Sequence, residues 1–330
     1  MINLSNPIAC WLLDSSYTKD INSNSKTISA TSILKSPRNI IFQQRLDYPN
    51  EFPEELIDEV NKFTVPSFNI EEDCFSRVPM RIGSAIHSAI EHTITNPDKL
   101  KQYLKHIGLI SDNIEIITDI SDFKDSYSRS KYYLFSEQRN SKTLDNGFTI
   151  TGQFDFVENG QLHDIKTTKT YSYEKEHLYK KYMIQGSIYR WLFPDIITRD
   201  TMIVDMVFTN FMKQSTTVDG PKLPIVQVEL QLMDVCMVED LLLNQTNILK
   251  EYWDKSLFEI PCCSDEMLYP NPPEYKYYKT GYEEGKRATR KFSTIYEAEN
   301  FKRNNGNVGD IVEFKGTPYY CPCCNLSLNF

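Results

Sequence analysis

The chain has 330 residues, of which 40% are hydrophobic, so it can form one large or two modest domains around a proper core. This composition excludes disorder of the whole chain. The sequence holds no run of about 18 apolar residues, and therefore predicts no helical membrane span. The short apolar patch at residues 8–13 has no basic stretch ahead of it and does not read as a secretory signal, so we expect a cytoplasmic protein that contacts no membrane.

The formal net charge of −9 is unfavourable for a protein that binds nucleic acid, but the charge is unevenly distributed. Residues 51–73 contain eight acidic side chains and one lysine. Residues 276–291 contain six basic and two acidic side chains, and residues 166–181 contain five lysines and two glutamates. A local basic track is sufficient for phosphate contacts, although each basic run alone is more typical of a solvated surface.

The first half of the chain has helical periodicity. Residues 29–47 are predicted to form a helix in two pieces, with Pro37 in the first turn of the second piece. Isoleucines at every fourth position predict an amphipathic helix over 81–94. A shorter helix is expected over 98–106, with Gly108 as its stop.

The period then changes to that of strands. Residues 131–138 read as a strand, and Asn146-Gly147 is a hairpin turn signal before a second strand at 148–157. Asn159-Gly160 is another such signal before a third strand at 161–167. Successive strands joined by tight turns predict an antiparallel meander.

After the meander, we expect a helix over 172–193, strands at 201–211 and 225–231, and a helix over 234–253. This order predicts an α/β fold with a mixed central sheet flanked by helices. The tail is rich in Pro, Tyr, Lys and Cys and has little long periodicity. We therefore divide the chain into a domain at 1–255 and a small module that is basic and Cys-rich at 256–330.

Eight cysteines in a cytoplasmic setting favour thiols or metal ligands over disulfides. Cys10, Cys74 and Cys236 are scattered and are interpreted as small buried residues. The spacing of Cys321 and Cys324 is that of a zinc knuckle, and Cys262-Cys263 could supply the other ligands. Thiols without metal remain the favoured alternative.

Two acids and a lysine converge in the meander. Pairing outward from the Asn159-Gly160 turn places Asp155 opposite Asp164, with the Cβ atoms about 5 Å apart on one face. Two carboxylates this close repel each other unless a cation lies between them. Lys166 projects from the same face because it lies two residues beyond Asp164.

This constellation suits metal-assisted cleavage of a phosphodiester. Carboxylates hold Mg²⁺ while leaving positions for water and phosphate, and the metal polarises the phosphate and lowers the pKa of a bound water. A lysine can orient or deprotonate that water, or neutralise charge that develops on phosphorus. The alternative for the triplet alone is a cross-strand salt-bridge cluster.

Two helices carry further candidates. His87 and Glu91 lie four residues apart and so share a helix face, as do Gln185 and Tyr189 on the later helix. His87 could be a metal ligand or a surface histidine, and Gln185 and Tyr189 could bind phosphate or simply form a half-buried face. Glycines at 83 and 152 could each permit a close approach of the backbone.

These motifs in this order resemble the RecB-like branch of the PD-(D/E)xK nuclease superfamily, in particular the stand-alone nucleases of bacteriophages. The resemblance covers roughly residues 28–255 and extends more weakly to the tail, where 286–292, Gly309 and the cysteines are similar to the C-terminal segment of such nucleases. The motifs are Gly83-x-x-x-His87-x-x-x-Glu91, Glu137, Gly152-x-x-Asp155, Asp164-x-Lys166 and Gln185-x-x-x-Tyr189.

The resemblance implies a restriction-endonuclease-like core and a role for each position. His87, Asp155, Asp164 and the backbone carbonyl of Ile165 would ligate Mg²⁺ or Mn²⁺. Lys166 would activate or position the water, while Gln185 and Tyr189 would hold the lysine or the DNA backbone. Glu91 and Glu137 would support the ligands from behind. Candidate DNA-contacting residues in the basic runs are Lys169, Lys180, Lys181, Lys286, Arg287 and Arg290.

The chain departs from the family pattern at two places. Phe154 stands before Asp155, where this branch usually has proline. Ser36-Pro37-Arg38 stands where nucleases with an iron–sulfur cluster often have Cys-Pro-Arg, which argues against a cluster here.

The leading hypothesis is a Mg²⁺-dependent DNA exonuclease, encoded by a phage and used in DNA recombination, replication or degradation in the host cytoplasm. A structure-selective endonuclease is the nearest alternative within the enzyme class. A catalytically silent DNA-binding protein and a protein–protein adaptor are alternatives from other classes. No Gly-x-x-x-x-Gly-Lys-Ser/Thr motif is present, so DNA unwinding would need a helicase as partner, and a recombinase or single-strand-binding protein could serve beside it.

Overall fold

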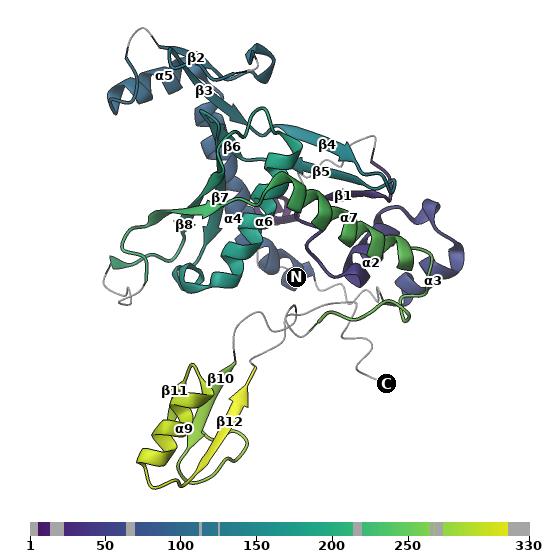
Figure 1. Ribbon diagram of the computed structural model, residues 1–330, viewed down its shortest axis with the longest axis vertical. Coiled ribbons are helices and arrows are strands. Elements are labelled where there is room, and N and C mark those ends of the chain that lie inside the picture. Colours follow the sequence, from purple (N-terminus) through teal and green to yellow (C-terminus); the bar gives the residue numbers. More distant parts are fainter. Residues whose placement is uncertain are drawn as a thin grey trace. The chain divides into compact units, whose positions relative to one another are not determined.

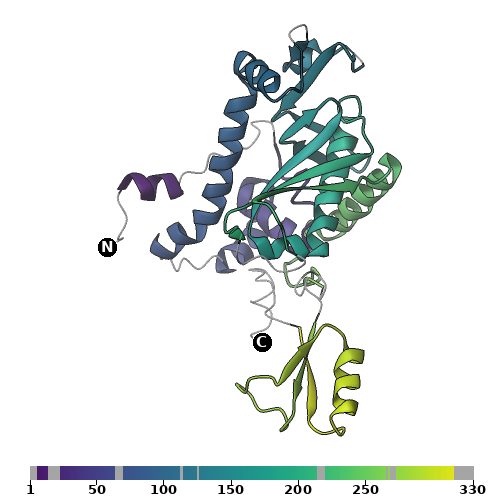
Figure 2. The same cartoon turned by 90° about the vertical axis from the view of Figure 1, so that its left-hand side faces the viewer.

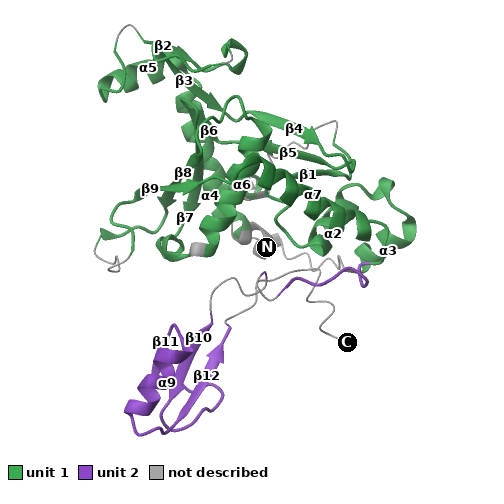
Figure 3. Ribbon diagram, viewed as in Figure 1, with its two compact units in different colours: residues 1–256 green, residues 257–330 purple. Residues whose placement is uncertain are grey.

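The computed structural model divides into two compact units, residues 1–256 and residues 257–330, each of which is described by itself (Figure 3). The described residues are 6–13, 23–63, 70–111, 114–124, 126–213, 220–264, 267 and 273–315. Among these, no helix is both long and apolar enough to cross a membrane.

The first unit is built on a six-stranded mixed sheet with the strand order β2-β3-β6-β7-β8-β9 (Figure 1). β3, β6 and β7 are antiparallel, whereas β2 is parallel to β3 and β8 is parallel to β7. The edge strand β9 is antiparallel to β8. The bounds are β2 Glu115–Ile117, β3 Lys131–Ser136, β6 Phe156–Glu158, β7 Gln161–Thr168, β8 Thr201–Phe208 and β9 Ile225–Gln231.

A second sheet of the first unit has the order β1-β5-β4, with bounds Thr27–Ser29, Thr149–Gln153 and Arg139–Thr143. The Asn146-Gly147 turn, predicted to lie between strands at 131–138 and 148–157, instead joins β5 to β4, a strand that was not predicted, and Gly147 has a φ of 89°. The predicted strand at 148–157 is therefore wrong as one element, because the chain leaves this sheet after Gln153 and enters the main sheet at Phe156. Phe154 is fully buried at the break and packs edge-on against Phe193.

The predicted helix at 29–47 is correct only in its second piece. Residues 27–29 form β1, which pairs in parallel with β5 and buries Ile28 opposite Ile150. The helix α2 spans Pro37–Asp47, with Pro37 in its first turn and the Ser36 hydroxyl accepting from the Asn39 amide. The strand forms because it pairs with β5, which lies more than a hundred residues later in the chain. Local periodicity does not show such a tertiary contact.

Helices cover both faces of the main sheet. α4 (Ile70–Ile94) packs against β7 and β3, and α6 (Glu176–Leu192) packs against β8 and β9. α7 (Val235–Tyr252) lies on α6, and Figure 2 shows α4 and α7 on opposite sides of the sheet. The mixed α/β fold with a central sheet flanked by helices is thus confirmed. The remaining helices of this unit are α1 Asn6–Leu13, α3 Glu54–Phe63 and α5 Pro97–His106, with short 3-10 turns at Pro49–Glu51, Ile120–Asp122 and Thr170–Glu174.

In the part of the second unit that the structure describes, a three-stranded antiparallel sheet with the order β11-β10-β12 packs with the helix α9. Tyr277 is almost fully buried between the sheet and α9, where it contacts Phe301. Thr294 and Glu297 form a capping box at the start of the helix. The bounds are β10 Glu274–Tyr278, β11 Arg290–Phe292, α9 Ile295–Asn304 and β12 Asp310–Phe314.

Candidate metal centre

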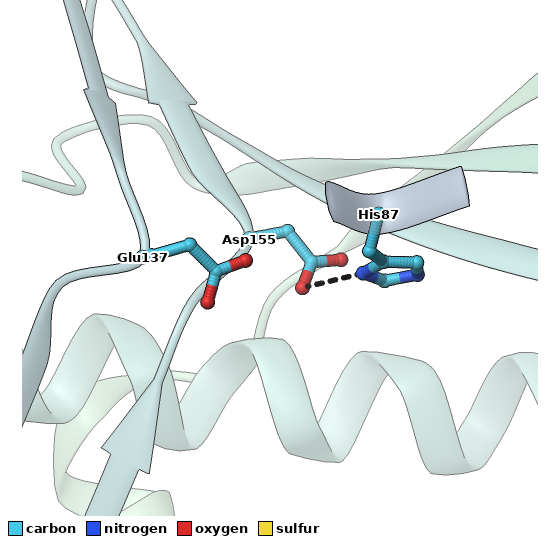
Figure 4. Close-up of side chains that lie close together, drawn as sticks. All are labelled: His87, Glu137 and Asp155. Carbon is cyan, nitrogen blue, oxygen red and sulfur yellow. Dashed lines mark ion pairs between the residues drawn. The ribbon is translucent and has the colours of Figure 1, made fainter. Parts of the chain in front are cut away.

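His87, Glu137 and Asp155 come together where the chain passes between the two sheets of the first unit (Figure 4). One ligand atom from each of the three side chains lies within 4.8 Å of the other two. His87 comes from α4, Glu137 from the link between β3 and β4, and Asp155 from the link between β5 and β6. We refer to these three residues as the acid–histidine cluster.

Asp155 is fixed on one side by the backbone. Its Oδ2 accepts a hydrogen bond of 2.6 Å from the Ile165 amide, while its Oδ1 lies 3.5 Å from His87 Nδ1. The hydrogen bond to Asp155 raises the pKa of His87 above its usual value, although burial opposes this. In an extended strand the N–H and C=O of one residue point to the same side, so the Ile165 carbonyl points to the strand edge on which Asp155 lies.

Glu137 is held in the cluster by its backbone and by a neighbouring amide. Its φ of 52° is left-handed, and its N–H donates to the Asp155 carbonyl at 3.0 Å. Gln153 Nε2 donates to Glu137 Oε2 at 2.5 Å. Burial, followed by the negative charge of Asp155, raises the pKa of the Glu137 carboxyl. The predicted supporting residue thus has a ligand atom in the cluster itself.

Asp164 and Lys166 form an ion pair beside the cluster. The β6–β7 ladder has the predicted register, with Phe156 opposite His163, and one further step places Asp155 opposite Asp164. Lys166 Nζ lies 2.7 Å from Asp164 Oδ2, and only 3% of the Asp164 side chain is exposed. Among the described residues, Asp164 is outside the group whose ligand atoms converge.

The ion pair keeps Lys166 charged. Burial alone would lower the pKa of the Lys166 ammonium, but the negative charges of Asp164 and Asp155 outweigh burial and hold its pKa above the usual value. The ammonium also lies 5.2 Å from the centre of the Tyr182 ring on α6. In the absence of a ligand, Lys166 is therefore a positive charge next to two carboxylates.

Gln185 and Tyr189 support the site from α6. Gln185 Nε2 donates to the Tyr189 hydroxyl at 2.7 Å, and burial raises the pKa of that hydroxyl. A Cβ on Gly152 would lie 3.0 Å from the Tyr189 ring. The glycine therefore permits a close approach of the backbone to Tyr189, as predicted. Gly83 is different, because its nearest neighbour, Thr167 Cβ, would be 3.9 Å away.

The acid–histidine cluster opens into a cavity of about 890 Å³. Glu91, Tyr189 and Lys166 line this cavity, together with hydroxyl groups from β1 and α4 and the guanidinium-bearing side chains of Arg81 and Arg139. Asp164 and Gln185 are not among the lining residues. The further lining side chains that the sequence did not single out include Ser29, Thr31, Ser84, Ser88, Thr151 and Gln153.

The sequence analysis missed Arg139 and Gln153. The two residues face each other across the β4–β5 pair, and Gln153 Oε1 accepts from Arg139 Nη2 at 2.7 Å and from Nε at 3.2 Å. The strand β4 that carries Arg139 was not predicted, and the observed register differs by one residue from that of a two-residue turn at Asn146-Gly147. The sequence does not show that the β4–β5 hairpin ends next to the acid–histidine cluster.

The predicted DNA-contacting residues are all exposed. Lys169, Lys180 and Lys181 lie around the start of α6, whereas Lys286, Arg287 and Arg290 belong to the second unit. Lys286 lies 3.2 Å from Glu283, and the Arg290 guanidinium lies 4.8 Å from the centre of the Phe301 ring. Solvent exposure is necessary for phosphate contacts, and their role in DNA binding stays a prediction.

The cysteines differ from the prediction in part. Cys10 and Cys236 are exposed, so their interpretation as small buried residues is wrong; Cys236 lies in the first, solvent-facing turn of α7. Cys262 is exposed and Cys263 is half-buried. Cys321 and Cys324 lie outside the described residues, as does the side chain of Cys74. A zinc site that joins the two cysteine pairs stays a prediction.

No protein-family model matches the chain, and no curated protein matches it. Among solved structures, the chain is similar to the crystal structure of SSO0001, at 17% identity and a TM-score of 0.34, covering 71% of this chain and 79% of that one. It is also similar to a phage-related exonuclease from Haemophilus somnus 129PT, at 19% identity and a TM-score of 0.25, covering 38% of this chain and 64% of that one. The chemistry of the site therefore has to be argued from its own residues.

Proposed function

We propose that this chain is a divalent-metal-dependent deoxyribonuclease that hydrolyses phosphodiester bonds at the acid–histidine cluster. The observation that supports this most is the convergence of His87, Glu137 and Asp155 within 4.8 Å on the wall of an open cavity, with Lys166 beside them. An imidazole and two carboxylates at this separation are a suitable ligand set for Mg²⁺ or Mn²⁺.

The residues fit a divalent cation for a reason of charge. Asp155 and Glu137 repel each other, and each of their carboxylates lies partly buried. A cation would remove this repulsion, and the Ile165 carbonyl would be a further ligand. When bound, the metal would polarise the phosphodiester and lower the pKa of an attacking water. Asp164 would join the ligands by giving up part of its contact with Lys166.

Lys166 supplies the positive charge that the reaction needs at phosphorus. Its ammonium is held beside Asp155 and lines the cavity, where it can bind a phosphate oxygen or orient a water molecule. Gln185 and Tyr189, joined by a hydrogen bond, support the site from α6.

The mode of cleavage is part of the proposal. The order α4, then antiparallel β3, β6 and β7, then α6 and parallel β8 agrees with a restriction-endonuclease-like core, and the motif resemblance to RecB-like phage nucleases favours an exonuclease acting on DNA in the cytoplasm. The roles of this activity in recombination, replication or degradation, and any recombinase or helicase partner, rest on that resemblance alone.

The test is degradation of end-labelled linear duplex DNA by the wild type and by Lys166→Ala, in Mg²⁺ and in EDTA, beside a closed circular DNA. We expect loss of the linear DNA only in Mg²⁺, and a fall in rate of about 10²- to 10³-fold in the variant. Lys250→Ala, which changes an exposed lysine of α7, is the matched control. Cleavage of the circle would show an endonuclease, and intact DNA that is nevertheless bound would show a silent DNA-binding protein.

A further inference from the structure

A second cavity, of about 390 Å³, lies next to the first one. It is bounded by the turn that contains Ile120 and Phe123, by the chain at 138–140, and by the end of α6 with the residues that follow it, 192–196. Cavities that bind small organic groups are commonly of about 300–1,000 Å³. The volume is therefore sufficient for one nucleoside.

Arg139 lines both cavities and so marks the place where they meet. Its side chain is exposed and is oriented by two hydrogen bonds to Gln153 Oε1. The other end of the same amide donates to Glu137 Oε2 at 2.5 Å. The Gln153 amide thus links the Arg139 guanidinium to the acid–histidine cluster.

The second cavity has the chemistry of a nucleobase site. Its lining combines apolar and polar residues and includes two aromatic ones, Phe123 and Phe193. Aromatic side chains bind the flat face of a base. The carboxylate of Asp195 also lines the cavity, which disfavours a phosphate inside it and leaves Arg139 as the phosphate contact.

We propose that the second cavity binds an unpaired nucleobase of the DNA strand, and that Arg139 holds the phosphate between this nucleotide and the one at the acid–histidine cluster. This inference rests on the proposed nuclease function and adds a subsite to it. It implies that the strand enters the site with at least one base separated from its complement.

The experiment uses single-stranded oligonucleotides that carry 2-aminopurine at successive positions, bound to the full chain in EDTA, where cleavage does not occur. Ile120→Trp fills the second cavity, and Arg139→Gln removes the charge between the cavities. Ile107→Trp and Arg199→Gln change exposed residues elsewhere in the first unit and are the matched controls. Arg139→Gln alters an exposed side chain and tests the same site if Ile120→Trp does not fold.

We expect the fluorescence to change at one position in the wild type and in both controls, and to lose that change in Ile120→Trp and Arg139→Gln, with affinity lowered about tenfold. An unchanged profile and affinity in both site variants would overturn the subsite while leaving the nuclease intact, because cleavage in Mg²⁺ would persist. A wild type that neither binds nor cleaves DNA would overturn both proposals together.

Discussion

Glu137 combines an unfavourable backbone with an unfavourable charge. A left-handed conformation costs a residue other than glycine about 1–2 kcal/mol, and the φ of Glu137 is 52°. Its carboxylate also lies beside Asp155, whose charge contributes to its raised pKa. A cation bound between the two carboxylates, as proposed above, would offset both costs.

We therefore predict that Glu137→Gln binds Mn²⁺ about 10- to 100-fold more weakly than the wild type, because one charged ligand is lost and the neutral amide binds the cation poorly. Isothermal titration calorimetry on the DNA-free protein measures this directly. Glu239→Gln, on the exposed surface of α7, should leave the affinity unchanged. An equal affinity in wild type and Glu137→Gln would remove Glu137 from the ligand set.

The two glycines of the site motifs should respond in opposite ways to alanine. In Gly152→Ala the new Cβ would lie 2.7 Å from Leu192 Cδ1 and 3.0 Å from the Tyr189 ring, so we expect a loss of about 1–3 kcal/mol in the free energy of unfolding. Gly83→Ala meets only Thr167 Cβ at 3.9 Å inside α4, so a gain of about 0.5–1 kcal/mol is expected. Urea unfolding of both variants tests the pair, and a loss of stability in Gly83→Ala would contradict it.

At the scale of elements, α2 is joined to the end of α7 by one buried guanidinium. Arg45 is fully buried, and its Nη2 donates to the carbonyls of Trp253 at 3.0 Å and Lys255 at 2.6 Å. Burial lowers the pKa of Arg45, while Glu59 and Asp254 oppose the shift. The Arg45 guanidinium thus donates hydrogen bonds to carbonyls at the end of α7 that have no partner within the helix.

Arg45→Ala is expected to destabilise the first unit by about 3–5 kcal/mol, because it leaves a cavity and two buried carbonyls without a donor. Thermal unfolding followed by circular dichroism gives the value. Arg129→Ala, at an exposed position, should change the stability by less than about 0.5 kcal/mol. A small effect of Arg45→Ala would mean that water replaces the guanidinium.

Local signals in the sequence predicted most elements but not their long-range partners. The Asn159-Gly160 turn was sufficient for the register that places Asp155 opposite Asp164, and helical periodicity was sufficient for the second half of α4 and for α6. The strand predicted at 148–157 was wrong as one element, because the chain changes sheets within it. The parallel pairing of β1 with β5 was not predictable from residues 27–29 alone, because Ile28 becomes a strand residue only by packing on Ile150. The family resemblance gave Glu137 only a supporting role, and nothing local in the sequence shows that the chain changes sheets there.

At the scale of the whole molecule, the candidate metal centre and one group of candidate DNA-contacting residues belong to different units. We therefore expect cleavage and part of the DNA binding to be separable. The acid–histidine cluster and its cavity belong to the first unit, whereas Lys286, Arg287 and Arg290 belong to the second. Arg45 ties the first unit together through residues up to Lys255. A chain that ends at Ser256 thus keeps the described contacts of the cluster and of α7.

We predict that this shortened chain folds and degrades linear DNA in Mg²⁺, but binds DNA more weakly and with a smaller dependence of affinity on salt concentration, since about three phosphate contacts are lost. Fluorescence anisotropy at several salt concentrations measures the slope, and the triple variant Lys286→Ala, Arg287→Ala, Arg290→Ala of the full chain should reproduce it. If the truncation leaves both the affinity and the slope unchanged, the basic residues of the second unit do not contact DNA. If the triple variant behaves as the wild type while the truncation weakens binding, the contact lies elsewhere in that unit.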